Sequence, residues 1–180
     1  AEALASFGPG TVEVVEAVNF NDPIQTVIAG TKAGVDKACE VLKAAGAKRA
    51  LPLPVSAPFH SSLMKPAAEK LRMALAEVAL ATPQIPVVNN VDVVVQQDAD
   101  AIREALYRQA FGPVRWVECV HALKGRGVTH IIECGPGKVL AGLTKRIDPE
   151  LVGAALFDSA TLAETCLLYT SPSPRDRTRS

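Results

Sequence analysis

The stretch THIIECGPGKVLAGLTKRI, which runs from Thr129 to Ile147, decides the fold class of this chain. Its beginning, THIIECG, is rich in apolar and β-branched residues and predicts a strand, and the GPGK turn leads into a helix expected over 139–146. A further apolar run over 151–157 predicts a second strand. Strands that alternate with helices form a parallel sheet with helices on its faces, so we expect an α/β fold.

The first part of the chain predicts a smaller arrangement. We expect strands over 11–19, 26–30 and 49–55, and a helix over 32–45 that Thr31 caps. The order strand, strand, helix, strand is that of the second half of a ferredoxin-like unit.

Between these two regions, the hydrophobic pattern predicts three helices and one strand. The helices are expected over 63–80, from 98 or 100 to 109, and over 116–124. The segment 86–95, PVVNNVDVVV, is almost continuously apolar and predicts a strand that is covered on both faces. These elements continue the alternation of strands and helices in the larger part of the fold.

The composition of the 180-residue chain excludes several classes of function. It has 19 Lys and Arg residues and 19 Asp and Glu residues, so the net charge is zero and we expect no nucleic acid partner. We also expect no membrane, because no apolar run approaches the roughly 20 residues that a membrane span needs. The first residues, AEALASFGPG, contain neither a methionine nor a signal-peptide pattern, so we expect an internal cut and a cytoplasmic protein.

The four cysteines predict structural thiols rather than a metal site. None of them lies in a C-x-x-C pair or beside a histidine at zinc-ligand spacing. The first three lie in apolar patterns, where free thiols are commonly buried. We therefore expect no metal ligands among Cys39, Cys119, Cys134 and Cys166.

His60 lies in a loop of small residues, within PVSAPFHSSLMKP over 54–66. A neutral imidazole there could take a proton from a serine and return it to a leaving group, although a histidine that caps a helix or fills the core is commoner. The adjacent Ser61 is poorly placed to be the nucleophile, because the nucleophile and the base come from separate elements in such enzymes. No G-x-S-x-G turn occurs in the chain.

The other candidates for chemistry are weaker. His121, on a predicted helix, and His130, at the start of a predicted strand, are expected at the surface or its boundary. The GPGK turn over 135–138 opens a helix and could bind an anion, but a plain tight turn is the favoured interpretation.

Five segments, in order along the chain, carry a resemblance to a known family. They are VNFNDPIQTVIAG over 18–30, AKRALPLPVSAPFHSSLMKPA over 47–67, IPVVNNVD over 85–92, RQAFGPVRW over 108–116 and ECGPGKVLAGLTKRI over 133–147. Together they resemble the malonyl-CoA:acyl carrier protein transacylase family of bacterial fatty acid synthesis. The resemblance extends more weakly to about residue 165.

The resemblance implies a ping-pong transfer of a malonyl group from coenzyme A to the phosphopantetheine thiol of acyl carrier protein, through an acyl-serine intermediate. It implies that His60 is the general base and that the main-chain carbonyl of Gln109 orients the imidazole. Phe59 matches a position that narrows the acyl pocket in related acyltransferases, and Asn19 and Asn21 match a motif near the cleft. An aromatic plug for Phe59 and a turn for the two asparagines are the open alternatives.

The implied partners are acyl carrier protein and a coenzyme A thioester. The resemblance implies no cofactor bound to the enzyme and no metal, because phosphopantetheine belongs to the carrier protein. The full-length enzyme is expected to be a monomer.

The resemblance also divides the chain. It implies that residues 1–56 are the second half of an inserted ferredoxin-like small subdomain. Residues 57–165 would be the C-terminal part of a large α/β-hydrolase-like acyltransferase core. Residues 166–180, CLLYTSPSPRDRTRS, lack periodicity and resemble a translated sequencing adapter, with a disordered tail or an expression scar as alternatives.

Several functional residues of the family have no match in this chain. These are its nucleophilic serine, its glutamine motif and the arginine that pairs with the malonyl carboxylate, so we expect the chain to be inactive alone. Two alternatives stay open: an acyltransferase piece of a polyketide or multidomain fatty acid synthase, and a non-catalytic fragment that docks the carrier protein.

Overall fold

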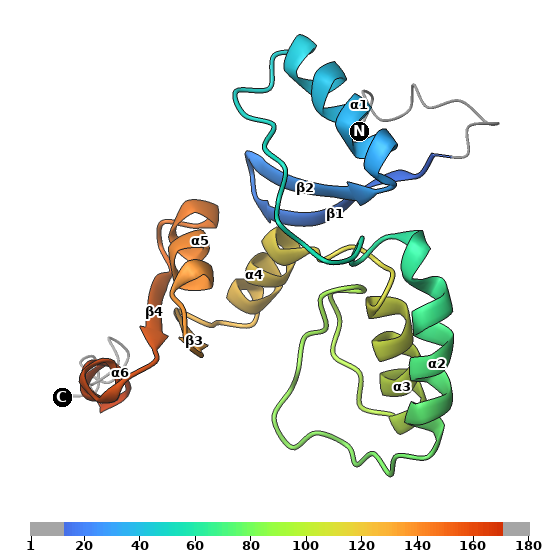
Figure 1. Ribbon diagram of the computed structural model, residues 1–180. Coiled ribbons are helices and arrows are strands. Elements are labelled where there is room, and N and C mark those ends of the chain that lie inside the picture. Colours follow the sequence, from blue (N-terminus) through green and yellow to red (C-terminus); the bar gives the residue numbers. More distant parts are fainter. Residues whose placement is uncertain (1–12, 171–180) are drawn as a thin grey trace. The chain divides into compact units, whose positions relative to one another are not determined.

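The computed structural model describes residues 13–170, which divide into two compact units with the boundary between Ala122 and Leu123. The elements of the first unit, shown in blue to yellow in Figure 1, are β1 (Val15–Asp22), β2 (Gln25–Gly30), α1 (Lys32–Ala44), the 3₁₀ helix η2 (Ser62–Met64), α2 (Lys65–Ala76), α3 (Ala99–Gln109) and the greater part of α4 (Trp116–Gly125). Those of the second unit are β3 (His130–Cys134), α5 (Val139–Ile147), β4 (Val152–Leu156) and α6 (Ser159–Thr170).

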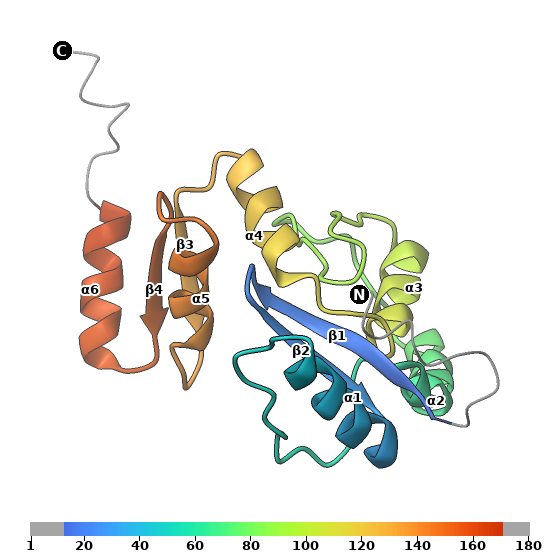
Figure 2. The same cartoon turned by 90° about the horizontal axis from the view of Figure 1, so that it is seen from above.

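The strands β1 and β2 form an antiparallel hairpin, with Val15 opposite Gly30 and Asp22 opposite Gln25. The carboxylate of Asp22 accepts a hydrogen bond from the N–H of Ile24 at 2.9 Å and closes the turn between them. The helix α1 follows directly, and its first turn is capped by the Thr31 side chain, as the sequence predicts. It lies along the hairpin (Figure 2).

The outer edge of β1 pairs with the segment that follows α3. The N–H of Phe20 donates to the carbonyl of Val114 at 2.9 Å, and the N–H of Val114 donates to the carbonyl of Val18 at 2.8 Å. These two bonds form a parallel bridge centred on Asn19. They attach the C-terminal end of α3 to the hairpin.

The helices α2 and α3 lie side by side, and polar side chains join them. Arg103 of α3 donates to the carbonyl of Leu75 at 3.1 Å and to that of Val78 at 2.8 Å, so it caps the C-terminal end of α2. Arg72 pairs with Glu104 across the two helices at 3.0 Å. Ala68 and Ala105 are buried on the facing sides.

The second unit contains the expected parallel pair. The strands β3 and β4 run parallel with His130 opposite Val152, and β4 lies between α5 and α6 (Figure 2). Leu143, Thr144 and Ile147 form the buried face of α5. The α/β fold class is therefore confirmed.

Two of the expected strands are wrong. Residues 49–55 form no strand, because Pro52 and Pro54 have no N–H to give to a ladder. Residues 86–95 form a tight turn instead of a strand. There the Asn89 side chain accepts a hydrogen bond from the Asp92 N–H at 2.7 Å, and a single bridge between Val88 and Val95 remains.

Other element boundaries also differ from expectation. The helix expected over 63–80 is shorter, since η2 precedes it and α2 ends at Ala76. The division expected after residue 165 lies within α6, and it stays a prediction. Residues 171–180 and the start of the strand expected over 11–19 lie outside the described residues. The division between residues 56 and 57 does not coincide with that of the two compact units, and it stays a prediction.

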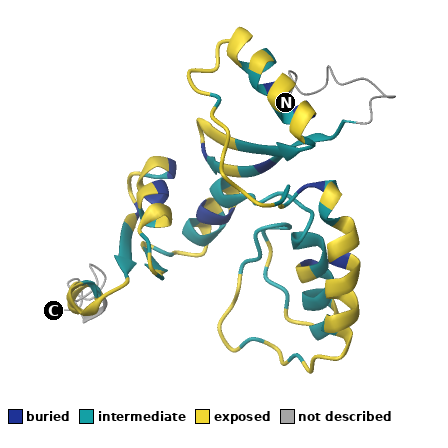
Figure 3. Cartoon of the chain, viewed as in Figure 1, coloured by how far each residue is buried: buried dark blue, intermediate teal, exposed yellow. Residues whose placement is uncertain are grey.

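Burial is uneven along the described residues. Figure 3 shows buried positions on the inner sides of α1, α2, α4 and α5, with long exposed stretches between the helices. Several exposed residues are large and apolar: Leu51 is 70% exposed, Val55 63% and Val87 58%. These residues lie in the two segments that were expected to be strands.

The N-cap of α3 offers a test of this fold. Asp98 accepts hydrogen bonds from the N–H groups of Asp100 and Ala101 at 3.0 and 2.9 Å. We expect Asp98→Ala to lower the free energy of unfolding by about 1 kcal/mol, because two helix N–H groups lose their acceptor. Asp98→Asn should lie close to the parent, since its side-chain oxygen still accepts. Urea unfolding followed by circular dichroism measures both, and equal losses in the two variants would contradict the assignment.

Candidate active site

His60 lies in a loop with an unusual backbone conformation. Its φ angle is 65°, in the left-handed region that residues other than glycine seldom adopt. The loop is held by Ser61, which is fully buried and donates its hydroxyl hydrogen to the carbonyl of Pro58 at 2.6 Å. The N–H of Ser61 donates to the same carbonyl at 3.2 Å. A strained conformation of this kind persists where neighbouring contacts fix it, and such residues are frequent at functional sites.

The imidazole of His60 meets the end of α3. Its Nδ1 lies 3.0 Å from the main-chain carbonyl oxygen of Gln109. Because a carbonyl can only accept, Nδ1 must carry the hydrogen, and the neutral ring then keeps Nε2 as an unprotonated acceptor. A histidine in this tautomer can act as a general base at Nε2.

The residue next to Gln109 in the last turn of α3 forms two ion pairs. The neighbouring Arg108 pairs with Asp92 at 2.6 Å and with Glu104 at 3.3 Å. The hydrogen bond to Asp92 raises the pKa of the Arg108 guanidinium, so Arg108 stays positively charged across the physiological range. These contacts join the last turn of α3 to the 86–95 turn.

Gly112 brings that turn close to the helix end. A Cβ atom at this position would lie 2.6 Å from Cγ2 of Val91 and 2.8 Å from the carbonyl oxygen of Arg108. The Gly112 N–H also donates to that carbonyl at 2.7 Å. Glycine is therefore the residue that allows the chain to leave α3 here without displacing its last carbonyls.

Among the described residues, the imidazole forms its hydrogen bond with the Gln109 carbonyl, so the roles expected for Phe59, Asn19 and Asn21 stay predictions. Phe59 precedes His60 and its side chain is 48% exposed. Asn19 and Asn21 are half-buried on β1, and no hydrogen bond joins either of them to His60. The turn that was their alternative lies just beyond them, at Asp22.

The sequence reasoning missed one residue near the site. Glu16 of β1 accepts a hydrogen bond from the N–H of Ser62 at 2.7 Å, although the two residues are 46 positions apart. No local signal could reveal this contact, because a glutamate in an alternating strand pattern predicts only a solvated face.

The weaker candidates are structural. His121 and His130 are exposed, as expected. The carboxylate of Glu133 accepts a hydrogen bond from the N–H of Ala141 at 2.9 Å. The carboxylate therefore supplies the negative charge at the first turn of α5 that a bound anion would otherwise supply. This contact supports the tight-turn interpretation of the GPGK segment.

The cysteines differ in burial: Cys39 is half-buried, whereas Cys134, which was expected in a buried apolar pattern, is exposed, as is Cys166. Cys119 is buried, and this burial raises the pKa of its thiol. Within residues 13–170 the cysteines form no disulfide, and no group of His, Cys, Asp and Glu side chains there could hold a metal ion.

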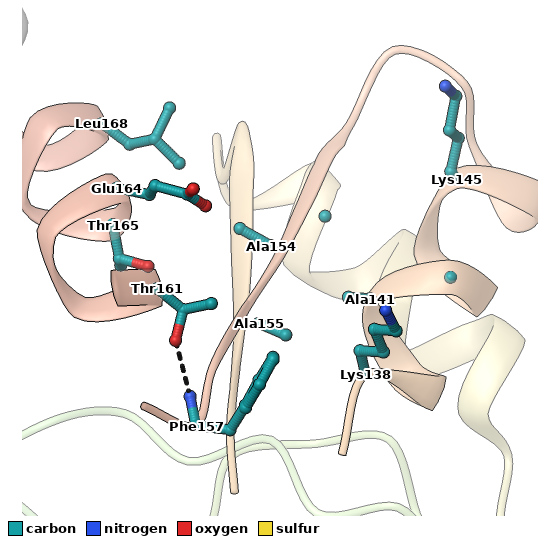
Figure 4. A pocket seen from close by; sticks show the side chains of 12 residues that line it. Lys138, Ala141, Lys145, Ala154, Ala155, Phe157, Thr161, Glu164, Thr165 and Leu168 are labelled. Carbon is teal, nitrogen blue, oxygen red and sulfur yellow. Dashed lines mark hydrogen bonds between the residues drawn. The ribbon is translucent and has the colours of Figure 1, made fainter. Parts of the chain in front are cut away.

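The second unit contains a cavity of about 680 Å³ between α5, β4 and α6. Figure 4 shows Lys138 and Ala141 on the α5 side and Thr161 and Glu164 on the α6 side. Thr161 accepts a hydrogen bond from the N–H of Phe157 at 3.1 Å and so serves the turn before α6. The cavity contains no histidine and no cysteine.

No helix between residues 13 and 170 combines the length and the apolar character that a membrane crossing requires.

Comparison with known proteins identifies relatives over most of the chain. No family model matches the chain. Malonyl CoA-acyl carrier protein transacylase of Salmonella typhimurium is 56% identical over 151 residues, which cover 84% of this chain and 49% of the relative. The protein of the same name from Bacillus subtilis is 45% identical over 165 residues, which cover 90% of this chain and 52% of the relative.

Solved structures give the same result. An acyl-carrier-protein S-malonyltransferase from Burkholderia pseudomallei matches with a TM-score of 0.84 and 66% identity, over 91% of this chain and 52% of that chain. A malonyl-transacylase in complex with a type II polyketide synthase acyl carrier protein matches with a TM-score of 0.86 and 52% identity, over 90% of this chain and 52% of that one. The chain thus spans about half the length of the relatives it matches.

The contact between His60 and a main-chain atom predicts a contrast between two variants. We expect Gln109→Ala to leave the Nδ1–H tautomer of His60 unchanged, because the side chain does not make the bond. Gly112→Ala should reduce the population of that tautomer and cost about 1–3 kcal/mol of stability, because the new methyl group displaces Val91 or the end of α3. Imidazole ¹⁵N shifts report the tautomer, and a larger change in Gln109→Ala than in Gly112→Ala would contradict the geometry.

Proposed function

We propose that this chain, which matches one half of the malonyl CoA-acyl carrier protein transacylases in sequence and in fold, is the C-terminal part of such an acyltransferase and contributes its general base. The observation that carries the proposal is the contact between Nδ1 of His60 and the Gln109 carbonyl at 3.0 Å. It leaves Nε2 free to exchange a proton with a nucleophile and a leaving group.

In the proposed reaction, His60 serves both halves of a ping-pong transfer. Nε2 takes the proton of a serine hydroxyl while the serine oxygen attacks the thioester carbonyl of malonyl-CoA, and it then gives this proton to the departing coenzyme A thiolate. In the second half, Nε2 takes the proton of the phosphopantetheine thiol while that sulfur attacks the acyl-serine. The proton finally returns to the serine oxygen, so the enzyme is regenerated.

The serines beside His60 are not the proposed nucleophile. Ser61 is buried and its hydroxyl is donated to Pro58, and both serines directly follow His60 in the chain instead of coming from a separate element. We place the nucleophilic serine in the half of the relatives that this chain does not span. A serine and a histidine from separate elements are the usual arrangement of such a pair.

The carbonyl partner has a consequence for the chemistry. A carbonyl that accepts the Nδ1 hydrogen fixes the tautomer, as the carboxylate of a catalytic triad would. It carries no full charge, so it stabilises the imidazolium ion less than a carboxylate does. The base therefore depends on its orientation more than on a neighbouring charge.

The proposed partners follow from the relatives. One of them is a malonyl-transacylase in complex with an acyl carrier protein, which supports a carrier protein as the acceptor. We propose a coenzyme A thioester as the donor, Phe59 as part of the acyl pocket, Asn19 and Asn21 as residues near the cleft, and a cytoplasmic, monomeric full-length enzyme. Phosphopantetheine belongs to the carrier protein in this proposal.

A second candidate concerns the acceptor. Because the relative in that complex works with a polyketide synthase carrier protein, the carrier could belong to polyketide rather than fatty acid synthesis. Transfer rates to purified carrier proteins of the two kinds distinguish these candidates, and the preferred acceptor is the one with the higher kcat/KM.

A chimera tests the function. Residues 13–147 of this chain, which include Glu16, would replace the corresponding residues of the Escherichia coli relative, which is 54% identical to this chain over the matched region. We expect the chimera to transfer malonyl groups from malonyl-CoA to acyl carrier protein, and the isolated 180-residue chain to show no transfer.

Substitution of His60 in the chimera tests the base. We expect His60→Ala and His60→Asn to lower kcat by roughly 10³-fold or more, because the serine loses its proton acceptor. Asparagine tolerates the left-handed backbone, so His60→Asn keeps the loop and separates lost chemistry from lost structure. His121→Ala, at an exposed position, is the matched control. Near-parental rates in both His60 variants would show that another residue is the base.

A further inference from the structure

We propose that Glu16 of β1 is a positioning residue for His60, because its carboxylate fixes the backbone just after the histidine. The carboxylate accepts the N–H of Ser62 at 2.7 Å, two residues beyond His60. Hydrogen bonds from a backbone N–H to an ionised carboxylate are roughly twice as strong as those between neutral groups. The importance of Glu16 for catalysis rests on the proposed function, whereas its effect on the loop does not.

The carboxylate takes the place of a helix cap. Ser61 precedes η2 in the N-cap position, but its side chain does not cap the helix because its hydroxyl is donated back to Pro58. Neither η2 nor α2 has an acidic residue in its first turn. Glu16 therefore supplies, from a distant strand, both the missing acceptor and the negative charge that favours a helix N-terminus.

This contact bears directly on the strained residue. A non-glycine residue at φ 65° needs neighbouring contacts to keep it there. Pro58 holds the backbone at Ser61, one residue beyond His60, and Glu16 holds it at Ser62. If the second contact is removed, the loop can relax toward ordinary backbone angles, and the imidazole then turns away from the Gln109 carbonyl.

The strand β1 also contacts the segment that follows Gln109, whose carbonyl accepts the hydrogen bond of the imidazole. Val18 and Phe20, just beyond Glu16 on β1, hydrogen-bond to Val114, which follows Gln109 by five residues. One strand therefore sets the position of the loop that carries the imidazole and of the segment that follows its acceptor. Glu16 is the side chain that links β1 to the histidine side.

Three variants of Glu16 test the inference in the 180-residue chain. In Glu16→Ala we expect the Ser62 amide to exchange its hydrogen at least about tenfold faster, because the amide loses a charged acceptor. The population of the Nδ1–H tautomer of His60, read from imidazole ¹⁵N shifts, should fall. Glu16→Gln keeps a side-chain oxygen as acceptor and should restore most of both properties, while Glu16→Asp is one methylene too short and should resemble alanine.

Glu40→Ala is the matched control, since Glu40 is an exposed residue of α1 and its loss changes the net charge equally. Parental amide exchange and tautomer in both Glu16→Ala and Glu16→Asp would overturn the inference. If Glu16→Ala fails to fold, Glu16→Asp and Glu16→Gln still decide it, because a positioning role requires the glutamine variant to be the better of the two.

The catalytic consequence is measured in the chimera. We expect Glu16→Ala to lower kcat by roughly 10–100-fold with little change in the KM for malonyl-CoA, because a misplaced base slows the chemistry without a direct contact with substrate. Glu16→Gln should recover most of kcat, whereas a purely structural defect would lower the amount of folded enzyme instead. A chimera that is inactive even with Glu16 present contradicts the proposed function, while amide exchange and tautomer still judge the role of Glu16.

Discussion

The hydrogen bond between the His60 imidazole and the Gln109 carbonyl depends on the strand β1. This strand contacts both the loop that carries the imidazole and the segment that follows the carbonyl. The imidazole is carried by a strained loop and the carbonyl by the last turn of a helix, and 49 residues separate the two. Neither element could hold its position alone, since an isolated loop at a positive φ angle relaxes and a helix end frays. The strand β1 contacts both sides, through the Glu16 carboxylate on one and the pairing with Val114 on the other.

Because the acceptor is a main-chain carbonyl, its position depends on how the end of α3 packs and not on the identity of a side chain. Any residue at position 109 supplies a carbonyl, so the constraint falls on the residues that place the end of α3. These include Gly112, where a Cβ atom would collide with Val91, and Arg108, which is paired with Asp92. A carboxylate partner would tolerate small displacements through its flexible side chain, whereas a carbonyl on a helix must be placed by the fold itself.

The sequence predicted the local elements well and the long-range contacts poorly. The β3–α5–β4 unit followed from its apolar strands and its GPGK turn, and the cap at Thr31 followed from its residue type. The strands predicted over 49–55 and 86–95 were wrong, because two prolines in the first segment and an asparagine turn in the second override the apolar pattern. His60 and Gln109 were paired through a family resemblance, not through the pattern of residues around them. The contact of Glu16 could not be predicted from the sequence, since its partner is 46 residues away and is a backbone N–H.

The two wrong strands still carry information about burial. Apolar residues of these two segments, such as Leu51 and Val87, are well exposed in the described chain, although an apolar strand pattern predicts burial. A hydrophobic pattern encodes burial in the complete fold, and exposed apolar surface of this extent is unusual for a self-sufficient domain. This chain spans about half the length of its relatives, so its pattern would refer to a core larger than the one its own residues build. The contact between His60 and Gln109 does not require that larger core, because the strand, the loop and the helix end that create it all belong to one compact unit.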